Sequence, residues 1–252
     1  ASPGVVAREA ADALRGLGPD PAALVIACRR LVERHPHAGP VWWLASRVLC
    51  APDPVAEARR AAAELDGDAT GAMVAAALPE GATVVLLGWP EVALEAVGLR
   101  GDVGVLLVSA RGESYGLPGQ LLAAGHAAED VDDAGLGGAV TSADVVLLEA
   151  TAAGPAAFAA AAGSHAAAAL GRAAGVPVWL VTGMGRMLPE RLWTAVEDRL
   201  QSAGPPPWER PVEVVARAQC DAVIGPEGAQ PASGPSPSAR CPVAPELLRP
   251  IE

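Results

Sequence analysis

The chain has 252 residues and a formal net charge of −11; 51% of the residues are hydrophobic, but only 3% are aromatic. This length suits one large α/β domain, or one such domain with a helical cap, with a core built from Ala, Val and Leu. Because an acidic surface does not attract phosphate backbones, we expect no nucleic-acid partner. No apolar run is long enough to cross a bilayer, so we also expect no membrane partner.

All 18 basic residues are Arg, and the chain contains no Lys and no Asn. Without Lys, Schiff-base chemistry and a P-loop are excluded, so a phosphate must be held by Arg, backbone N–H groups or helix N-termini. The N-terminal residues lack the basic start and long apolar run of a signal peptide, which predicts a cytoplasmic protein. The scattered cysteines have no metal-ligand spacing and no GxGxxG is present, so we expect reduced thiols, no metal and no cofactor.

Residues 1–79 are predicted to form an all-α N-terminal domain. Apolar residues recur at helical spacing from Val5 onward, and Asp20-Pro21 and Asp53-Pro54 are typical helix starts. Residues 69–78 either extend the fourth helix or form a fifth.

From residue 80 to residue 230, strands alternate with helices, which predicts a Rossmann-like α/β domain with a mostly parallel, doubly wound sheet. Several apolar runs lack polar alternation, as strands buried on both faces do. The predicted strands are Thr83–Leu87, Val103–Val108, Ala127–Val131, Val145–Leu148, Val176–Val181 and Cys220–Ile224. Residues 231–252 are rich in Pro and Ser at first and are predicted to be an extended C-terminal tail.

Polar residues follow several of these strands, at the sheet edge where open α/β sheets bind ligands. Arg111 and Arg186 each follow a strand and could hold a phosphate through the planar guanidinium, although Arg111 could equally be a solvated turn residue. Asp133 could bind sugar hydroxyls, act as a general base or cap a helix. Gly163 and Ser164 begin a predicted helix, whose N–H groups can bind an anion.

The block from Val145 to Trp193 resembles the family of the alpha, beta and delta subunits of translation initiation factor two-B, which includes methylthioribose-1-phosphate and ribose-1,5-bisphosphate isomerases. Its members carry a strand ending in Gly-Ala-Asp, then Gly, Asn-Lys-x-Gly-Thr, a Gly-Val-Pro-Val strand and a basic residue. The counterparts here are Glu149-Ala150-Thr151, Gly154, Ala160-Ala161-Ala162-Gly163-Ser164, Gly175-Val176-Pro177-Val178 and Arg186.

The resemblance implies a phosphorylated ligand and a homodimer formed through the α/β domain. It also matches Arg111 and Asp133 to family residues in the turns that follow two strands. The family's N-terminal Arg-Gly-Ala segment has no clear counterpart here, and Arg8 and Arg15 are the nearest residues to it. The isomerases use a Cys with the Asp of Gly-Ala-Asp. In this chain Thr151 occupies the position of that Asp, and no Cys follows the first strand. A hydroxyl does not replace a carboxylate as a proton shuttle near neutral pH.

Three hypotheses follow. The first is a regulatory, non-isomerase protein that binds a sugar phosphate or nucleotide. The second is a divergent sugar-phosphate isomerase, and the third is a non-catalytic protein-interaction subunit. In the first, the ligand contacts are Arg111, Asp133, Thr151, Gly163, Ser164 and Arg186; in the second, the carboxylate comes from Glu149, Asp133 or Glu113.

Overall fold

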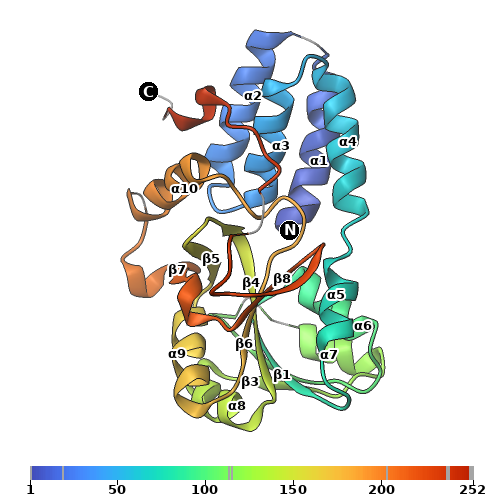
Figure 1. Ribbon diagram of the computed structural model, residues 1–252, viewed down its shortest axis with the longest axis vertical. Coiled ribbons are helices and arrows are strands. Elements are labelled where there is room, and N and C mark those ends of the chain that lie inside the picture. Colours follow the sequence, from blue (N-terminus) through green and yellow to red (C-terminus); the bar gives the residue numbers. More distant parts are fainter. Residues whose placement is uncertain are drawn as a thin grey trace.

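Four antiparallel helices form a bundle at one end of the molecule (Figure 1). The computed structural model describes residues 2–18, 20–112, 114, 116–202, 204–236 and 239–249. Asp20 and Asp53 cap two of these helices, accepting hydrogen bonds from the N–H groups of Ala22 and Ala56 at 3.0 Å, as the sequence predicts. The bundle helices are α1 (Pro3–Gly16), α2 (Pro21–Arg34), α3 (Gly39–Cys50) and α4 (Pro54–Asp66).

The second part is a mixed, mostly parallel sheet. Among the described residues it has nine strands, in the order β3-β2-β1-β4-β6-β8-β9, with β5 paired to β4 and β7 paired to β5. Strands β5, β7 and β9 pair antiparallel, and the others pair parallel. The α/β, Rossmann-like class is therefore confirmed. The strands are β1 (Thr83–Leu87), β2 (Gly104–Val108), β3 (Ala128–Val131), β4 (Val145–Ala153), β5 (Ala157–Ala161), β6 (Val178–Val181), β7 (Val212–Ala216), β8 (Ala222–Gly225) and β9 (Gly228–Pro231).

Helices cover both faces of the parallel strands, which explains their unbroken apolar sequences. Val84 and Leu86 of β1 pack with one helical layer, whereas Val85 and Leu87 pack with the other, because successive side chains of a strand point to opposite faces. The first layer contains α5 (Thr70–Ala77), α6 (Glu91–Gly98) and α7 (Leu117–Ala123); the second contains α8 (Leu136–Ser142) and α9 (Ser164–Ala174).

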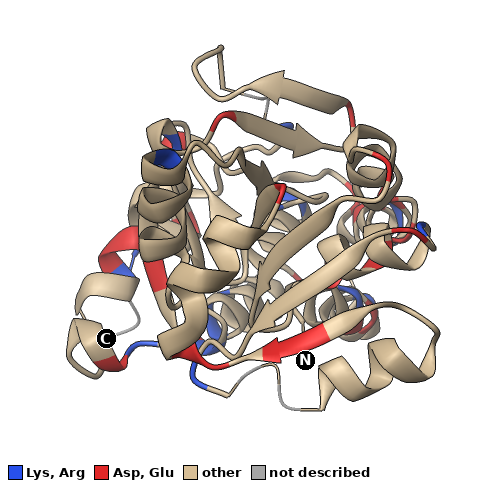
Figure 2. Ribbon diagram, turned by 90° about the horizontal axis from the view of Figure 1, so that it is seen from below, with Lys and Arg blue, Asp and Glu red and all other residues tan. Residues whose placement is uncertain are grey.

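The edge strand β3 carries two acidic residues, Glu129 and Asp130, and both are exposed. Charged side chains on an edge strand discourage pairing with another chain. Figure 2 shows further Asp and Glu positions on the helices and loops around the sheet, among which the Arg positions are interspersed. In the described part of the chain, no helix has the length and apolar character needed to span a membrane.

The packing differs from the predicted domain division at residue 79. Helix α5 packs against α6, β8 and β9, and its Val74 is fully buried in the sheet's core, so the first 79 residues do not form one packed unit. Conversely, α10 (Glu190–Ser202) packs its Leu192, Trp193 and Val196 into the core of the bundle. Apolar side chains on these two helices determine which core each one joins.

The predicted C-terminal tail, residues 231–252, is also corrected by the structure over its described part. Ser46 of α3 donates a hydrogen bond to the carbonyl of Pro242 at 2.6 Å and accepts one from the N–H of Ala244 at 2.8 Å. Ala244 and Leu247 are fully buried in the bundle core, and the 3₁₀ helix η4 (Pro245–Leu248) packs against α2 and α10. Because the segment is rich in Pro and Ser, the sequence did not predict that Ala244 and Leu247 would be buried.

The strand after the Val145–Leu148 run is longer than predicted. β4 continues to Ala153, with a register shift between Ala150 and Ala152, and the Ala-rich segment Ala157–Ala161 returns beside it as β5. Alanine has no strong preference for strands, so this antiparallel pair was not visible in the sequence. The longer β4 carries Thr151 beyond the parallel sheet toward the bundle.

Candidate functional site

A cleft of about 790 Å³ opens at the C-terminal ends of β1 and β4, where the bundle meets the sheet. This is the edge at which open α/β sheets bind ligands, so its position agrees with the strand-end rule. The sheet contributes residues of β1, β4, β5 and β7 and of the turns after β1 and β6, and the bundle contributes the start of α1 and the turn before α3. The lining residues are Ser2, Pro3, Val5, His37, Leu87, Trp89, Pro90, Glu91, Glu149, Thr151, Ala161, Arg186, Pro211 and Val212.

A buried ion pair forms part of the cleft wall. Nη1 of Arg186 lies 2.8 Å from Oε1 of Glu149, and their side chains are only 3% and 7% exposed. The other oxygen of Glu149 accepts hydrogen bonds from the N–H groups of Val92 and Ala93, both at 2.8 Å, in the first turn of α6. Burial raises the pKa of Glu149, and the positive charge of Arg186 opposes that rise.

The turn after β6 places Arg186 in this wall. The N–H of Met184 donates to Oδ2 of Asp68 at 2.7 Å, and the N–H of Arg186 donates to the carbonyl of Gly183 at 3.1 Å. A Cβ on Gly183 would lie 2.7 Å from that Asp68 oxygen, so only glycine allows this close approach. The linker between α4 and α5, where Asp68 lies, therefore fixes the turn that positions Arg186.

A second carboxylate reaches Arg186 from the start of α6. Oε2 of Glu91 lies 3.5 Å from Nη2 of Arg186, and Oε1 accepts a hydrogen bond from Nη2 of Arg8 at 3.2 Å. Arg8 belongs to α1 and also lies 3.7 Å from Asp66 of α4. Glu91 thus joins one Arg of the bundle to one Arg of the sheet at the edge of the cleft.

Of the predicted site residues, Glu149, Thr151 and Arg186 meet in the cleft. Thr151 donates its hydroxyl to the carbonyl of Ala159 at 3.2 Å, so the hydroxyl oxygen keeps its acceptor capacity. Glu113, the third carboxylate considered, lies outside the described residues.

Arg111 and Asp133 meet each other, but neither is among the described residues that line the cleft. Oδ2 of Asp133 accepts a hydrogen bond from the backbone N–H of Arg111 at 3.1 Å, and Nη1 of Arg111 donates to the carbonyl of Trp208 at 3.1 Å. Both side chains are exposed. Asp133 therefore stabilises a turn whose residues Ala110 and Arg111 have left-handed φ angles of 46° and 65°.

Gly163 and Ser164 do begin a helix, as predicted, but a carboxylate already occupies its N-terminus. Oε1 of Glu213 on β7 accepts a hydrogen bond from the N–H of His165 at 2.6 Å, and Ser164 is only 2% exposed. Gly163 has a φ of 93° and packs behind Leu87, a cleft residue. A negative side chain at a helix N-terminus takes the place that an anion would take.

Glu91, His37 and Trp89 also line the cleft, and none of them was predicted as a site residue. Glu91 and Trp89 follow strand β1, so the strand-end rule could have found them. His37 and Arg8 come from the bundle, and sequence spacing carries no information about which bundle residues face the sheet. Burial, then the neighbouring His35, lower the pKa of His37, which favours its neutral form.

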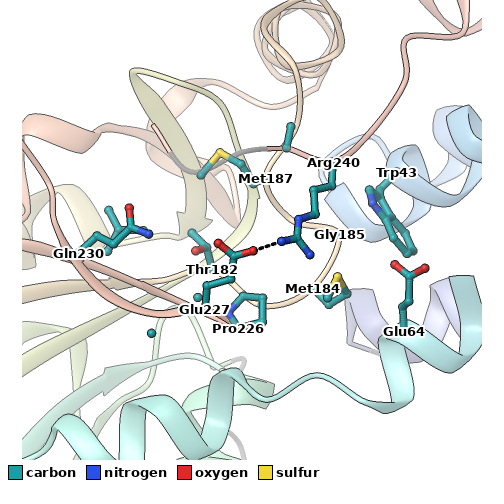
Figure 3. A pocket seen from close by; sticks show the side chains of 15 residues that line it. Trp43, Glu64, Thr182, Met184, Gly185, Met187, Pro226, Glu227, Gln230 and Arg240 are labelled. Atoms are coloured by element: carbon teal, nitrogen blue, oxygen red, sulfur yellow. Dashed lines mark ion pairs between the residues drawn. The ribbon is translucent and has the colours of Figure 1, made fainter. Parts of the chain in front are cut away.

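A smaller cavity of about 90 Å³ lies on the other side of the turn that carries Arg186. Figure 3 shows Met184, Met187 and Pro226 around it, with Trp43 and Glu64 on the side of the bundle. Glu227 and Arg240 point toward each other there and form an ion pair between the β8–β9 turn and the C-terminal segment. Both of these side chains are more than half exposed.

The described residues contain no group of three or more His, Cys, Asp or Glu side chains that could hold a metal ion. The four cysteines are free thiols, and none of them lines the cleft. Burial raises the pKa of Cys28 and of Cys220 to about 12, so these thiols remain protonated at neutral pH.

No protein-family model and no curated protein sequence matches the chain. Solved structures do match. Translation initiation factor eIF-2B of Pyrococcus horikoshii aligns with a TM-score of 0.76 at 15% identity, covering 89% of each chain. The beta subunit of eIF2B from Chaetomium thermophilum aligns with a TM-score of 0.69 at 15% identity, covering 90% of this chain and 82% of that one.

The 5-methylthioribose 1-phosphate isomerase of Pyrococcus horikoshii also aligns, with a TM-score of 0.54 at 13% identity, covering 88% of this chain and 83% of that one. These identities are low, but the coverage extends over both the bundle and the sheet. The resemblance stated from the sequence is thereby confirmed in three dimensions: this chain is a divergent protein with the fold of the initiation factor 2B subunits and of 5-methylthioribose 1-phosphate isomerase.

Proposed function

We propose that this protein binds a phosphorylated small molecule, a sugar phosphate or a nucleotide, in the cleft at the ends of β1 and β4. The observation that carries the proposal is the buried guanidinium of Arg186 in the cleft wall. A planar guanidinium held at the C-terminal edge of a parallel sheet is well suited to grip a phosphate. The cleft volume of about 790 Å³ is in the range of small-molecule sites.

The neighbouring side chains would recognise the rest of such a ligand. The hydroxyl oxygen of Thr151 and the carboxylate of Glu149 can accept hydrogen bonds from sugar hydroxyls. Trp89 lines the cleft with a side chain that is partly exposed, and it offers an apolar face to a sugar or base. The ligand would therefore carry its phosphate toward Arg186 and its hydroxyl groups toward β4.

We propose that this protein has lost the proton-transfer pair of the isomerases and that its binding is regulatory. Thr151 stands where the resemblance places the catalytic Asp, and no cysteine lines the cleft. A protein that holds the ligand without converting it acts as a sensor, and we propose that it does so as a homodimer. The tetrameric eIF2B-beta2-delta2 complex from Chaetomium thermophilum contains a chain of this fold, with a TM-score of 0.68, which supports an assembly of several copies.

Isothermal titration calorimetry with matched pairs tests the binding. Ribose 5-phosphate is compared with ribose, and AMP with adenosine, so that each pair differs only in the phosphate. We expect at least one phosphorylated member to bind and its partner to bind at least tenfold more weakly, roughly the effect of one charge-assisted contact. Arg186→Lys keeps the charge but loses the planar fork, so it should weaken the phosphorylated member alone. Equal binding within every pair, or no binding at all, contradicts the proposal.

The position of Glu149 favours a second candidate function, a divergent aldose–ketose isomerase. This carboxylate lines the cleft, and burial raises its pKa above the ordinary value, which makes it a stronger base. Incorporation of solvent deuterium into ribose 5-phosphate, followed by NMR, measures this activity. Exchange that requires the protein and is lost in Glu149→Gln establishes the enzyme; exchange no faster than in buffer excludes the aldose–ketose reaction.

A further inference from the structure

Glu91 lies between the side chains of Arg8 and Arg186 at the edge of the cleft. One of its oxygens accepts from Arg8 at 3.2 Å, and the other lies 3.5 Å from Nη2 of Arg186. These two Arg residues come from α1 and from the turn after β6, so the carboxylate sits where two separate elements converge. Two guanidinium groups around one oxyanion is the arrangement that also receives a phosphate.

The first turn of α1 adds to this preference for negative charge. An ideal Cβ on Gly4 would lie 2.8 Å from Oε2 and 3.2 Å from Oε1 of Glu91, so the absence of a side chain at Gly4 is what admits the carboxylate. Helix α1 has no acidic residue of its own in its first turn. Glu91 therefore supplies the negative charge that favours a helix N-terminus, from another part of the chain.

Glu91 is held less firmly than Glu149, although both contact Arg186. Glu149 is 7% exposed and accepts two backbone hydrogen bonds, whereas Glu91 is 26% exposed. The Oε2 atom of Glu91 is buried but has no hydrogen-bond partner among the described residues. Glu91 is held by ion pairs of 3.2 Å and 3.5 Å and, unlike Glu149, accepts no backbone hydrogen bond among the described residues, so it is the carboxylate of this network that a ligand can displace more readily.

We infer that Glu91 is a built-in competitor for the phosphate of the ligand. In the free protein its carboxylate pairs with Arg8 and, beside Glu149, with Arg186; on binding, the phosphate takes its place and the Glu91 side chain rotates toward solvent. This inference rests on the proposed function and assigns to it a residue that sets affinity. The protein then responds only to ligand concentrations high enough to overcome its own carboxylate.

Glu91→Gln tests the inference, because it keeps the shape of the side chain and removes the competing charge. The ligand no longer has to break the ion pairs of Glu91 with Arg8 and with the buried Arg186, so ribose 5-phosphate should bind about tenfold more tightly, while ribose should be unaffected. The matched control is Glu95→Gln. This residue lies one turn further along α6, is exposed and faces Gly71 of α5, so the variant changes net charge equally without touching the cleft.

A second variant should displace the Glu91 carboxylate from Arg8 and Arg186 without changing the net charge. In Gly4→Ala the new methyl group would lie only 2.8 Å from Oε2 of Glu91 and should push this flexible side chain outward, so ribose 5-phosphate affinity should again increase. Thermal unfolding of each variant shows that the fold is retained.

The two proposals fail in different ways. If the wild-type protein binds ribose 5-phosphate and Arg186→Lys weakens it, but Glu91→Gln leaves the affinity unchanged or lower, the competitor role is refuted and the proposed function stands. If neither the wild-type protein nor Glu91→Gln binds any phosphorylated member of the panel, both are refuted. If Glu95→Gln tightens binding as much as Glu91→Gln does, net charge alone is responsible and the competitor role is again refuted.

Discussion

Removing the guanidinium of Arg186 should destabilise the fold, because Glu149 would remain buried without its counter-charge. The pair is 2.8 Å long and almost fully excluded from water. Removing one partner of such a pair costs about 3–5 kcal/mol, and the two backbone N–H groups that still hold Glu149 place the expected loss at about 3 kcal/mol. For a chain of this size, that loss corresponds to a decrease of roughly 6–12 °C in the melting temperature of Arg186→Met.

The assay is thermal unfolding of Arg186→Met, Glu149→Gln and the double variant, with the free energies combined in a double-mutant cycle. The double variant removes both charges, so it should be less destabilised than the sum of the singles, by about 1–3 kcal/mol. Additive losses, or a loss below about 1 kcal/mol in Arg186→Met, would refute the view that the pair compensates a buried carboxylate.

The destabilisation caused by Arg186→Met should also depend on pH. The pKa of Glu149 in the folded protein is raised above its ordinary value, with burial as the main cause. A raised carboxyl pKa favours folding below the ordinary pKa, and this contribution is lost as the pH increases through the raised value. Without Arg186 the pKa of Glu149 should increase further, so the deficit of Arg186→Met should be larger at pH 8 than at pH 5. An equal deficit at both pH values would contradict this reasoning.

Two further predictions concern packing and thiol chemistry. Gly154→Ala should destabilise the protein by roughly 1–3 kcal/mol or more, because its Cβ would lie 2.2 Å from Cγ of Trp193, and thermal unfolding measures the loss; an unchanged melting temperature would show that Trp193 moves freely. With a thiol reagent at pH 7, exposed Cys50 should react first, whereas Cys28 and Cys220 are buried with pKa values of about 12 and should react only on unfolding; mass spectrometry identifies the labelled residue, and early labelling of Cys28 would contradict the structure.

The sequence predicted the strand and helix order well where apolar residues run without interruption. The runs in β1 and β4 are buried on both faces, and the Asp-Pro helix starts at Asp20 and Asp53 are real caps. The prediction from sequence was wrong in segments whose composition does not indicate the structure that packing gives them. Ala157–Ala161 has no period that distinguishes a strand from a helix, and the burial of Leu247 in a Pro-rich segment depends on a groove supplied by other helices.

The candidate site was likewise predicted only in part from the sequence. The rule that ligands bind at strand C-termini led to Glu149, Thr151 and Arg186, which do meet in one cleft. The same rule named Ser164, but it could not show that Glu213 comes from a distant strand to cover that helix start. Such pairings depend on contacts between residues far apart in sequence, for which a single sequence holds no signal.

The chain passes repeatedly between the bundle and the sheet: after α4, on entering and leaving α10, and again in the segment that Ser46 fastens to α3. A hinge requires few connections, because each one must absorb the rotation of one body against the other. With this many connections, wide opening and closing of the two halves is restrained, and the cleft between them is already shaped before a ligand arrives. A preformed cleft spares the ligand the free-energy cost of ordering its site. Recognition in this protein should therefore depend on the exchange of side-chain partners, and crystals of the free protein should tolerate soaking with ligand.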